Sequence, residues 1–139
     1  MRFAYRADLV QRKLLRQMQI HRILVVDDSR YSRDLLMDSL KGPSYEFSAV
    51  DDGSKAVAEA ERFDPNLVLM DIQMPILDGY GALAALRAIP RFQALRVIAV
   101  TAHARQSDRD RVSAAGFDGF VAKPVSAALL RSLVAAMLK

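Results

Sequence analysis

Short apolar runs alternate with longer amphipathic segments from residue 22 to the end of the chain. The runs predict strands at 23–26, 45–50, 67–70, 97–100 and 120–122. The segment 45–50 is expected to be an edge strand because its polar and apolar residues alternate. Helical patterns fill the intervals, at 30–41, 54–63, 80–88, 106–115 and 126–138. Gly116 is suited to end the helix at 106–115, and Ser126 is suited to cap the N-terminus of the last helix. Strands that alternate with helices imply right-handed crossovers, so the pattern predicts an α/β domain with a five-stranded parallel sheet and helices on both faces.

Polar side chains directly follow four of the predicted strands. Because the carboxyl ends of parallel strands share one edge of the sheet, these side chains are expected to converge where open α/β sheets bind ligands. They comprise three carboxylates, a hydroxyl and an ammonium: Asp27, Asp28, Asp71, Thr101 and Lys123. Three carboxylates alone would repel one another and raise one another's pKa. Mg²⁺ removes this repulsion, and it also binds phosphate oxygens.

This set of side chains suits phosphoryl transfer. Asp71, which ends a buried run, can act as a nucleophile and form an aspartyl phosphate. Lys123 can pair with a carboxylate or a phosphate, and Thr101 can donate one hydrogen bond to a phosphate oxygen. Because phosphoryl transfer needs mainly positioning and charge neutralisation, the set predicts a phosphoacceptor site.

Composition narrows the class of protein. A chain of 139 residues with 52% hydrophobic and 26% charged residues fits one soluble globular domain. The absence of cysteine excludes disulfides, thiolate metal sites and cysteine nucleophiles. No apolar stretch is long enough to span a bilayer, and the N-terminus lacks the pattern of a secretory signal. We therefore expect a cytoplasmic protein.

The net charge of +4 belongs to the start of the chain, where residues 1–22 hold six basic residues against Asp8 alone. The rest is close to neutral, so nucleic-acid binding is not expected of the main domain. Residues 1–21 are expected to form a basic amphipathic helical extension to a domain at 22–139, with an apolar stripe of Phe3, Ala7, Val10, Leu14 and Met18. We expect this helix to pack on the last helix or across a homodimer. The alternatives are a linker from a longer sensor protein, and contact of the basic face with a membrane surface or nucleic acid.

Four stretches match a known pattern in order: "ILVVDDSR" (23–30), "LVLMDIQMPILDG" (67–79), "VIAVTAHA" (97–104) and "AAGFDGFVAKP" (114–124). On these stretches the chain, over residues 22–138, resembles the receiver domain of two-component response regulators. The resemblance implies a flavodoxin-like, CheY-like fold. It also implies that Asp71 accepts a phosphoryl group from a phosphohistidine on a histidine kinase or histidine phosphotransfer protein. The protein would then be a switch that acts on a downstream protein target and not an enzyme.

The resemblance also implies a metal site. Asp28 and Asp71 would bind Mg²⁺ directly, together with the backbone carbonyl of Gln73, and Asp27 would act largely through water. Lys123 would contact the phosphoryl group. The peptide bond between Lys123 and Pro124 is expected to be cis, an isomer that proline makes accessible.

The family's switch residues map to Thr101, which would move toward the phosphoryl group, and to Phe120, which would rotate inward behind it. A readout that depends on a tyrosine hydroxyl is in doubt here because position 120 is Phe. The family tunes the lifetime of the phosphoryl group at the positions of Gln73 and His103. With no further domain after Lys139, output is expected through protein–protein contact.

Three other functions compete with a stand-alone receiver. The same motifs would suit a receiver segment of a hybrid sensor kinase that acts as a phosphorelay intermediate. An aspartyl-nucleophile phosphatase of the haloacid-dehalogenase type needs a second acid two positions after the nucleophile, where this chain has Gln73 after Asp71 and Arg30 after Asp28. An interaction module independent of phosphorylation is disfavoured by the intact site.

Overall fold

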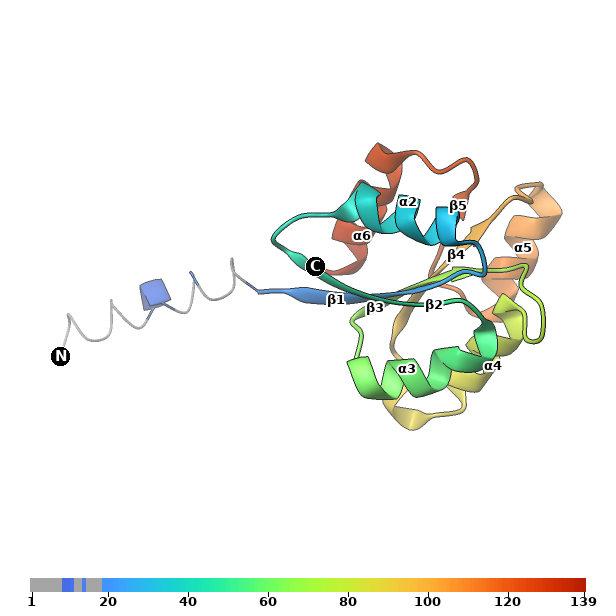
Figure 1. Cartoon of the computed structure of the whole chain (residues 1–139), viewed down its shortest axis with the longest axis horizontal. Helices are drawn as coiled ribbons and strands as arrows, with labels where there is room; N and C mark the ends of the chain where they lie inside the picture. The colour runs from blue at the N-terminus through green and yellow to red at the C-terminus, as the bar shows by residue number, and fades with distance from the viewer. Residues whose placement is uncertain (1–8, 12–13, 15–18) are drawn as a thin grey trace.

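The computed structural model describes residues 9–11, 14 and 19–139. In this part, a five-stranded parallel sheet has the order β2-β1-β3-β4-β5. Its strands are β1 (His21–Val26), β2 (Tyr45–Val50), β3 (Leu67–Asp71), β4 (Arg96–Thr101) and β5 (Gly119–Ala122). The α/β class and the edge position of 45–50 are thus confirmed (Figure 1).

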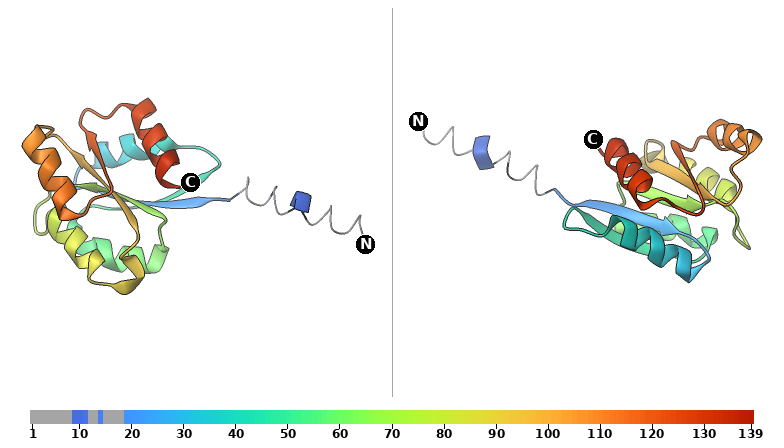
Figure 2. Two further views of the ribbon diagram at one scale, coloured as in Figure 1. Left: turned by 180° about the vertical axis from the view of Figure 1, so that it is seen from behind. Right: turned by 90° about the horizontal axis from the view of Figure 1, so that it is seen from above.

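Helices cover both faces of the sheet. They are α2 (Arg30–Leu40), α3 (Ala56–Phe63), α4 (Gly79–Arg87), α5 (Gln106–Ala115) and α6 (Ala127–Met137). In Figures 1 and 2, α2 and α6 lie on one face of the sheet, and α3, α4 and α5 lie on the other. The fold is the flavodoxin-like arrangement that the alternation of strands and helices predicts.

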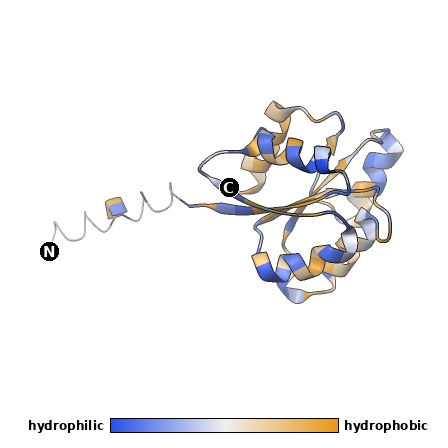
Figure 3. Cartoon of the chain, viewed as in Figure 1, coloured by the Kyte–Doolittle hydropathy of each residue, from blue (hydrophilic) through white to orange (hydrophobic). Residues whose placement is uncertain are grey.

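Each central strand supplies both cores, because successive side chains of a strand point to opposite faces. In β1, Ile23 and Val25 pack with residues of α2 and α6, whereas Leu24 and Val26 pack with residues of α3 and α4. All four side chains are fully buried. Burial on both faces explains why β1, β3 and β4 each contain a continuous apolar run, which Figure 3 shows in the centre of the molecule.

Two local predictions needed correction. The segment 54–63 is not a single α-helix: a 3₁₀ turn, η1 (Gly53–Lys55), precedes α3. A second 3₁₀ turn, η2 (Pro90–Phe92), lies between α4 and β4, where the sequence pattern indicated no element. The predicted helix ends are confirmed, since Ser126 accepts a hydrogen bond from the backbone N–H of Leu129 and Gly116 has φ of 103°.

The predicted extension at 1–21 lies largely outside the described residues. Within it, Leu9, Val10 and Leu14 are helical and exposed, at 47%, 59% and 51%. The expected contact of this segment with α6 or with a second copy stays a prediction. No helix in the described part of the chain combines the length and the hydropathy needed to cross a membrane.

Candidate functional site

The parallel register brings the polar strand ends to one edge of the sheet. Asp27 and Asp28 follow β1, Asp71 ends β3, and Lys123 follows β5. One carboxylate oxygen from each of the three aspartates lies within 4.8 Å of the others. Lys123 Nζ lies 3.1 Å from Asp27 Oδ2 and 3.7 Å from Asp71 Oδ2. Residues up to 96 positions apart thus form one cluster of three acids and one ammonium.

The carboxylate of Asp27 is fully buried and fixed by three donors. Its Oδ1 accepts a hydrogen bond from the backbone N–H of Ser29 at 2.9 Å. Its Oδ2 accepts from the Ser32 hydroxyl at 2.7 Å and from the Lys123 ammonium at 3.1 Å. The bond from Ser32 was missed at the level of sequence, where the only signal is a hydroxyl in the first turn of the following helix. With most of its acceptor sites used, Asp27 has little capacity for a direct metal bond.

Asp71 is buried as well, with 6% exposure, and its charge is less well compensated. Its Oδ1 accepts a long hydrogen bond of 3.3 Å from the backbone N–H of Gln73. Burial raises the pKa of Asp71 to about 6, the nearby charge of Asp27 adds to the rise, and Lys123 opposes it. The carboxyl that the sequence nominates as a nucleophile therefore costs free energy to ionise in the metal-free protein.

Thr101 and Lys123 are tied to each other through the backbone. Thr101 ends β4, is buried at 3% exposure, and its Oγ1 accepts a hydrogen bond from the backbone N–H of His103 at 3.1 Å. The backbone N–H of Lys123 donates to the carbonyl of Thr101 at 2.8 Å. The Lys123–Pro124 peptide bond is cis, as expected. These contacts place the loop after β5 against the end of β4.

Phe120, the second predicted switch residue, is half-buried in β5 opposite Ala99. The guanidinium of Arg109, on α5, lies 4.8 Å from the centre of its ring. This is a cation–π contact. The inward rotation expected of Phe120 stays a prediction, and so do the roles of Gln73 and His103 in the lifetime of a phosphoryl group.

The loop after β3 is packed tightly against the site. A Cβ atom at Gly79 would lie 2.4 Å from the carbonyl oxygen of Asp71, so only glycine allows α4 to begin this close to β3. The N–H of Gly79 donates to the carbonyl of Ile72 at 2.9 Å, and Asp78 caps α4 by accepting from the N–H of Gly81 at 2.8 Å. Within the loop, Ile76 has φ of 72° and is 84% exposed, a strained position for a β-branched residue. The sequence pattern did not indicate this strain.

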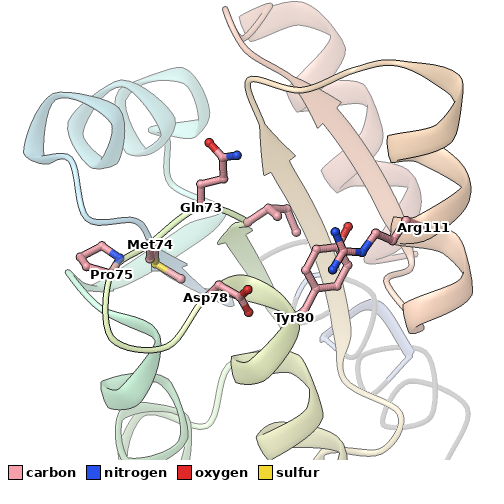
Figure 4. A pocket seen from close by; sticks show the side chains of 7 residues that line it. Gln73, Met74, Pro75, Asp78, Tyr80 and Arg111 are labelled. Atoms are coloured by element: carbon pink, nitrogen blue, oxygen red, sulfur yellow. The ribbon is translucent and has the colours of Figure 1, made fainter.

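A polar groove lies beside the acidic cluster, between this loop and α5 (Figure 4). Arg111 stacks on the ring of Tyr80 with its guanidinium carbon 4.4 Å from the ring centre, and Tyr80 packs edge-on against Phe117. The groove is lined by the following residues: Ile72, Gln73, Met74, Pro75, Asp78, Tyr80 and Arg111. The contact between Tyr80 and Arg111 was not predicted from the hydrophobic pattern of the chain.

The residues fit a divalent cation on chemical grounds. Three carboxylates converge, one of them has a pKa raised by burial and by its acidic neighbour, and Asp28 is exposed and accessible from solvent. A hard cation with oxygen ligands would remove the repulsion between the acids. The candidate direct ligands are Asp28, Asp71 and the carbonyl of Gln73, and Asp27 is the candidate for a contact through water.

Comparison with known proteins gives the family. Residues 23–135 match the model of the response regulator receiver domain. The chain belongs to this family. It is therefore a phosphoacceptor receiver of two-component signalling.

Several relatives are similar to this receiver. An uncharacterised 14.6 kDa protein of Leptolyngbya boryana is 36% identical, over 81% of this chain and 86% of the relative. The polar-differentiation response regulator DivK of Brucella ovis is 31% identical, over 75% of this chain and 85% of DivK. The signal transduction histidine-protein kinase BarA of Escherichia coli is 34% identical over 81% of this chain, and the match spans only 12% of BarA.

Solved structures agree on the fold. The receiver domain of sensor histidine kinase PA1611 from Pseudomonas aeruginosa, solved with a magnesium ion in its active-site cleft, has a TM-score of 0.78 and 34% identity, and the match covers 86% of this chain and 98% of that domain. The chemotaxis protein CheY4 of Vibrio cholerae has a TM-score of 0.80 at 24% identity, covering 86% of this chain and 99% of that protein. The flavodoxin-like, CheY-like fold is thus confirmed.

Proposed function

We propose that this receiver accepts a phosphoryl group on Asp71 from a phosphohistidine of a histidine kinase or histidine phosphotransfer protein. The observation that carries the proposal is the position of Asp71. It ends a buried strand, has a carboxylate oxygen within 4.8 Å of one from each of two other aspartates, and lies 3.7 Å from the ammonium of Lys123. A carboxylate at that position presents a nucleophilic oxygen at the functional edge of the sheet. The ammonium of Lys123 is close enough to pair with the incoming phosphoryl group.

In the transfer, a carboxylate oxygen of Asp71 forms the new bond to phosphorus. The bond between phosphorus and the donor's imidazole nitrogen breaks, and the electron pair stays on that nitrogen, which takes up a proton. Lys123 compensates the negative charge of the phosphoryl oxygens, and the hydroxyl of Thr101 donates a hydrogen bond to one of them. Donation requires that Thr101 turn its hydroxyl hydrogen toward the anion, while its oxygen can go on accepting from the His103 N–H.

Asp28, Asp71 and the carbonyl of Gln73 would hold Mg²⁺, with Asp27 acting through water. When bound, Mg²⁺ supplies positive charge to the acids and to the phosphoryl oxygens. The chain's own part is to keep one carboxylate oxygen of each of the three aspartates within 4.8 Å of the others.

The signal would leave the site through Thr101 and Phe120. Movement of Thr101 toward the phosphoryl group would open space for Phe120 and release its contact with Arg109. The resulting change at α5 and β5 would alter binding of a downstream protein target. This makes the receiver a cytoplasmic switch that promotes only its own phosphorylation and dephosphorylation, with Gln73 and His103 setting the lifetime of the phosphoryl group.

The organisation beyond the receiver allows two versions of the function. In the first, residues 1–21 form a basic helical extension that mediates contact with α6 or a homodimer. In the second, the receiver is a segment of a hybrid sensor kinase and relays the phosphoryl group onward. The match to the histidine kinase BarA supports this second version, because the matching part is only 12% of that kinase.

Mass spectrometry of the intact protein after incubation with acetyl phosphate and Mg²⁺ tests the assignment. The natural chain is expected to gain one phosphoryl group, and Asp71→Asn is expected to gain none. Asp78→Asn is the matched control, because asparagine caps a helix as well as aspartate does, and it should be phosphorylated normally. Phosphorylation of Asp71→Asn at another residue would overturn the proposal.

A further inference from the structure

The ammonium of Lys123 lies close to two acids, Asp27 and Asp71. In this structure it donates to Asp27 Oδ2 at 3.1 Å and lies 3.7 Å from Asp71 Oδ2. An anion attached to Asp71 draws the ammonium away from Asp27. A fully buried carboxylate that loses a hydrogen-bond donor pays a desolvation penalty, so the departure of Lys123 is opposed unless another donor remains.

Ser32 is placed to be that donor. Its hydroxyl donates to the same oxygen, Asp27 Oδ2, at 2.7 Å, the shorter of the two bonds to that atom. This hydroxyl comes from α2, whereas Lys123 comes from the loop after β5, so the two donors belong to separate segments of the fold.

The position of Ser32 is itself fixed. Its backbone N–H donates to the side chain of Ser29, the cap of α2, at 3.2 Å. The next residue, Arg33, donates from its guanidinium to the backbone carbonyl of Asp27 at 2.9 Å. The first turn of α2 is thus held to the segment that carries Asp27, which keeps the Ser32 hydroxyl within reach of the carboxylate.

We propose that Ser32 is a positioning residue for phosphoryl transfer: its hydroxyl holds Asp27 when Lys123 moves to the phosphoryl group on Asp71. The proposal rests on the proposed function. Without the hydroxyl, Asp27 depends more strongly on Lys123, and Lys123 is less available to the anion. The loss should therefore appear in the affinity for the anion and not in the affinity for Mg²⁺, because removal of Ser32 takes no oxygen ligand from the cluster.

Two titrations of the full chain test this. Mg²⁺ binding is measured by calorimetry in the absence of an anion, and beryllofluoride binding is measured by NMR at saturating Mg²⁺. Ser32→Ala is expected to bind beryllofluoride roughly five- to tenfold more weakly, the usual effect of losing a hydrogen bond to a charged group, and to keep its Mg²⁺ affinity within about twofold. Ser32→Thr, which restores a hydroxyl, should bind beryllofluoride within about twofold of the natural chain.

Ser39→Ala is the matched control. Ser39 lies on the same helix, but its hydroxyl donates to the carbonyl of Leu35 at 2.7 Å, so its loss should leave both affinities unchanged. Equal beryllofluoride affinities of Ser32→Ala and the natural chain would overturn the inference and leave the proposed function intact. A parallel fall in both affinities would also overturn it, because it would indicate a general loosening of the site. Failure of the natural chain to bind beryllofluoride with Mg²⁺ would instead overturn the proposed function.

Discussion

Lys123 is closer to Asp27 than to Asp71: its Nζ lies 3.1 Å from Asp27 Oδ2 and 3.7 Å from Asp71 Oδ2. The lysine is only 26% exposed, and both acids are buried. The better-paired acid is the one that already has two other donors, Ser29 and Ser32. Asp71, the proposed phosphoacceptor, is therefore left with the larger share of uncompensated charge.

Replacing Lys123 with Met should destabilise the metal-free protein at pH 7.5 by roughly 1–3 kcal/mol, because two buried acids lose their shared cation. Mg²⁺ should then stabilise this variant more than it stabilises the natural chain, since a bound cation replaces part of the missing charge. Urea unfolding with and without Mg²⁺ measures both effects. Lys41→Met changes an exposed lysine at the end of α2 and is the control. Equal stabilisation of Lys123→Met and the natural chain by Mg²⁺ would contradict the prediction.

The pKa of Asp71 predicts a pH-dependent stability. Burial raises this pKa from 3.8 to about 6, so the folded protein binds the proton more tightly than the unfolded chain does. The ionised carboxyl therefore destabilises the fold above about pH 6, and the penalty disappears as the pH falls through the window from 6 to 3.8. In EDTA, Asp71→Asn should be more stable than the natural chain at pH 7.5 by roughly 1–3 kcal/mol.

Urea unfolding of both proteins at several pH values between 4 and 8 measures this difference. The gain from Asp71→Asn should shrink steadily below pH 6. It should also shrink at pH 7.5 when Mg²⁺ is added, because only the natural chain has the third carboxylate. A gain that does not change with pH would mean that relief of charge is not its cause.

The location of the site could be predicted from sequence, but its internal bonds could not. Asp71 and Lys123 follow apolar runs, and in a parallel sheet every such position lies at the same edge whatever the details of packing. The bond from Ser32 to Asp27 depends instead on how α2 is rotated about its axis, which its packing on the sheet decides. The strain at Ile76 and the turn η2 depend on the local path of short connections. Such connections have no hydrophobic periodicity from which their conformation could be predicted.

The contacts of Arg87 also could not be predicted from sequence. They are expected to contribute to stability and not to Mg²⁺ binding. The Arg87 guanidinium donates to the carbonyls of Phe92 at 2.8 Å and Leu95 at 2.7 Å, and to the carboxylate of Asp118 at 3.1 Å. These partners precede β4 and β5, at the edge of the sheet opposite the acidic cluster. Arg87→Met should destabilise the protein by roughly 2–4 kcal/mol, because three partly buried acceptors lose their donor.

Urea unfolding measures the loss in Arg87→Met, and calorimetry should find its Mg²⁺ affinity unchanged. Arg91→Met is the comparison, because its ion pair with Asp64 is half-exposed on both sides and should contribute less than about 1 kcal/mol. Similar losses of stability in the two variants would contradict the larger contribution expected from the hydrogen bonds of Arg87.

Gly79 couples the start of α4 to the site. A methyl group at this position would lie 2.4 Å from the carbonyl oxygen of Asp71 and 2.8 Å from the Cα of Ile72, so the backbone must shift. Gly79→Ala is expected to destabilise the protein by roughly 1–3 kcal/mol and to weaken Mg²⁺ binding roughly tenfold, because the same loop carries Gln73. Calorimetry measures the affinity. Gly42→Ala, where the nearest atom lies 4.0 Å away, should change neither property, and normal Mg²⁺ binding by Gly79→Ala would be evidence against the coupling.

The helix expected to respond to phosphorylation, α5, is weakly anchored. Val112 is its one buried residue, whereas α6 buries both Leu130 and Val134. Two arginines on its sides, Arg109 over Phe120 and Arg111 over Tyr80, supply contacts that remain partly in solvent. Because local opening needs less free energy where little apolar surface is buried, the amides of α5 should exchange with deuterium roughly tenfold or more faster than those of α6. Exchange followed by mass spectrometry over 106–115 and 127–137 measures the difference, and equal protection of the two helices would argue that α5 is held by more than these contacts.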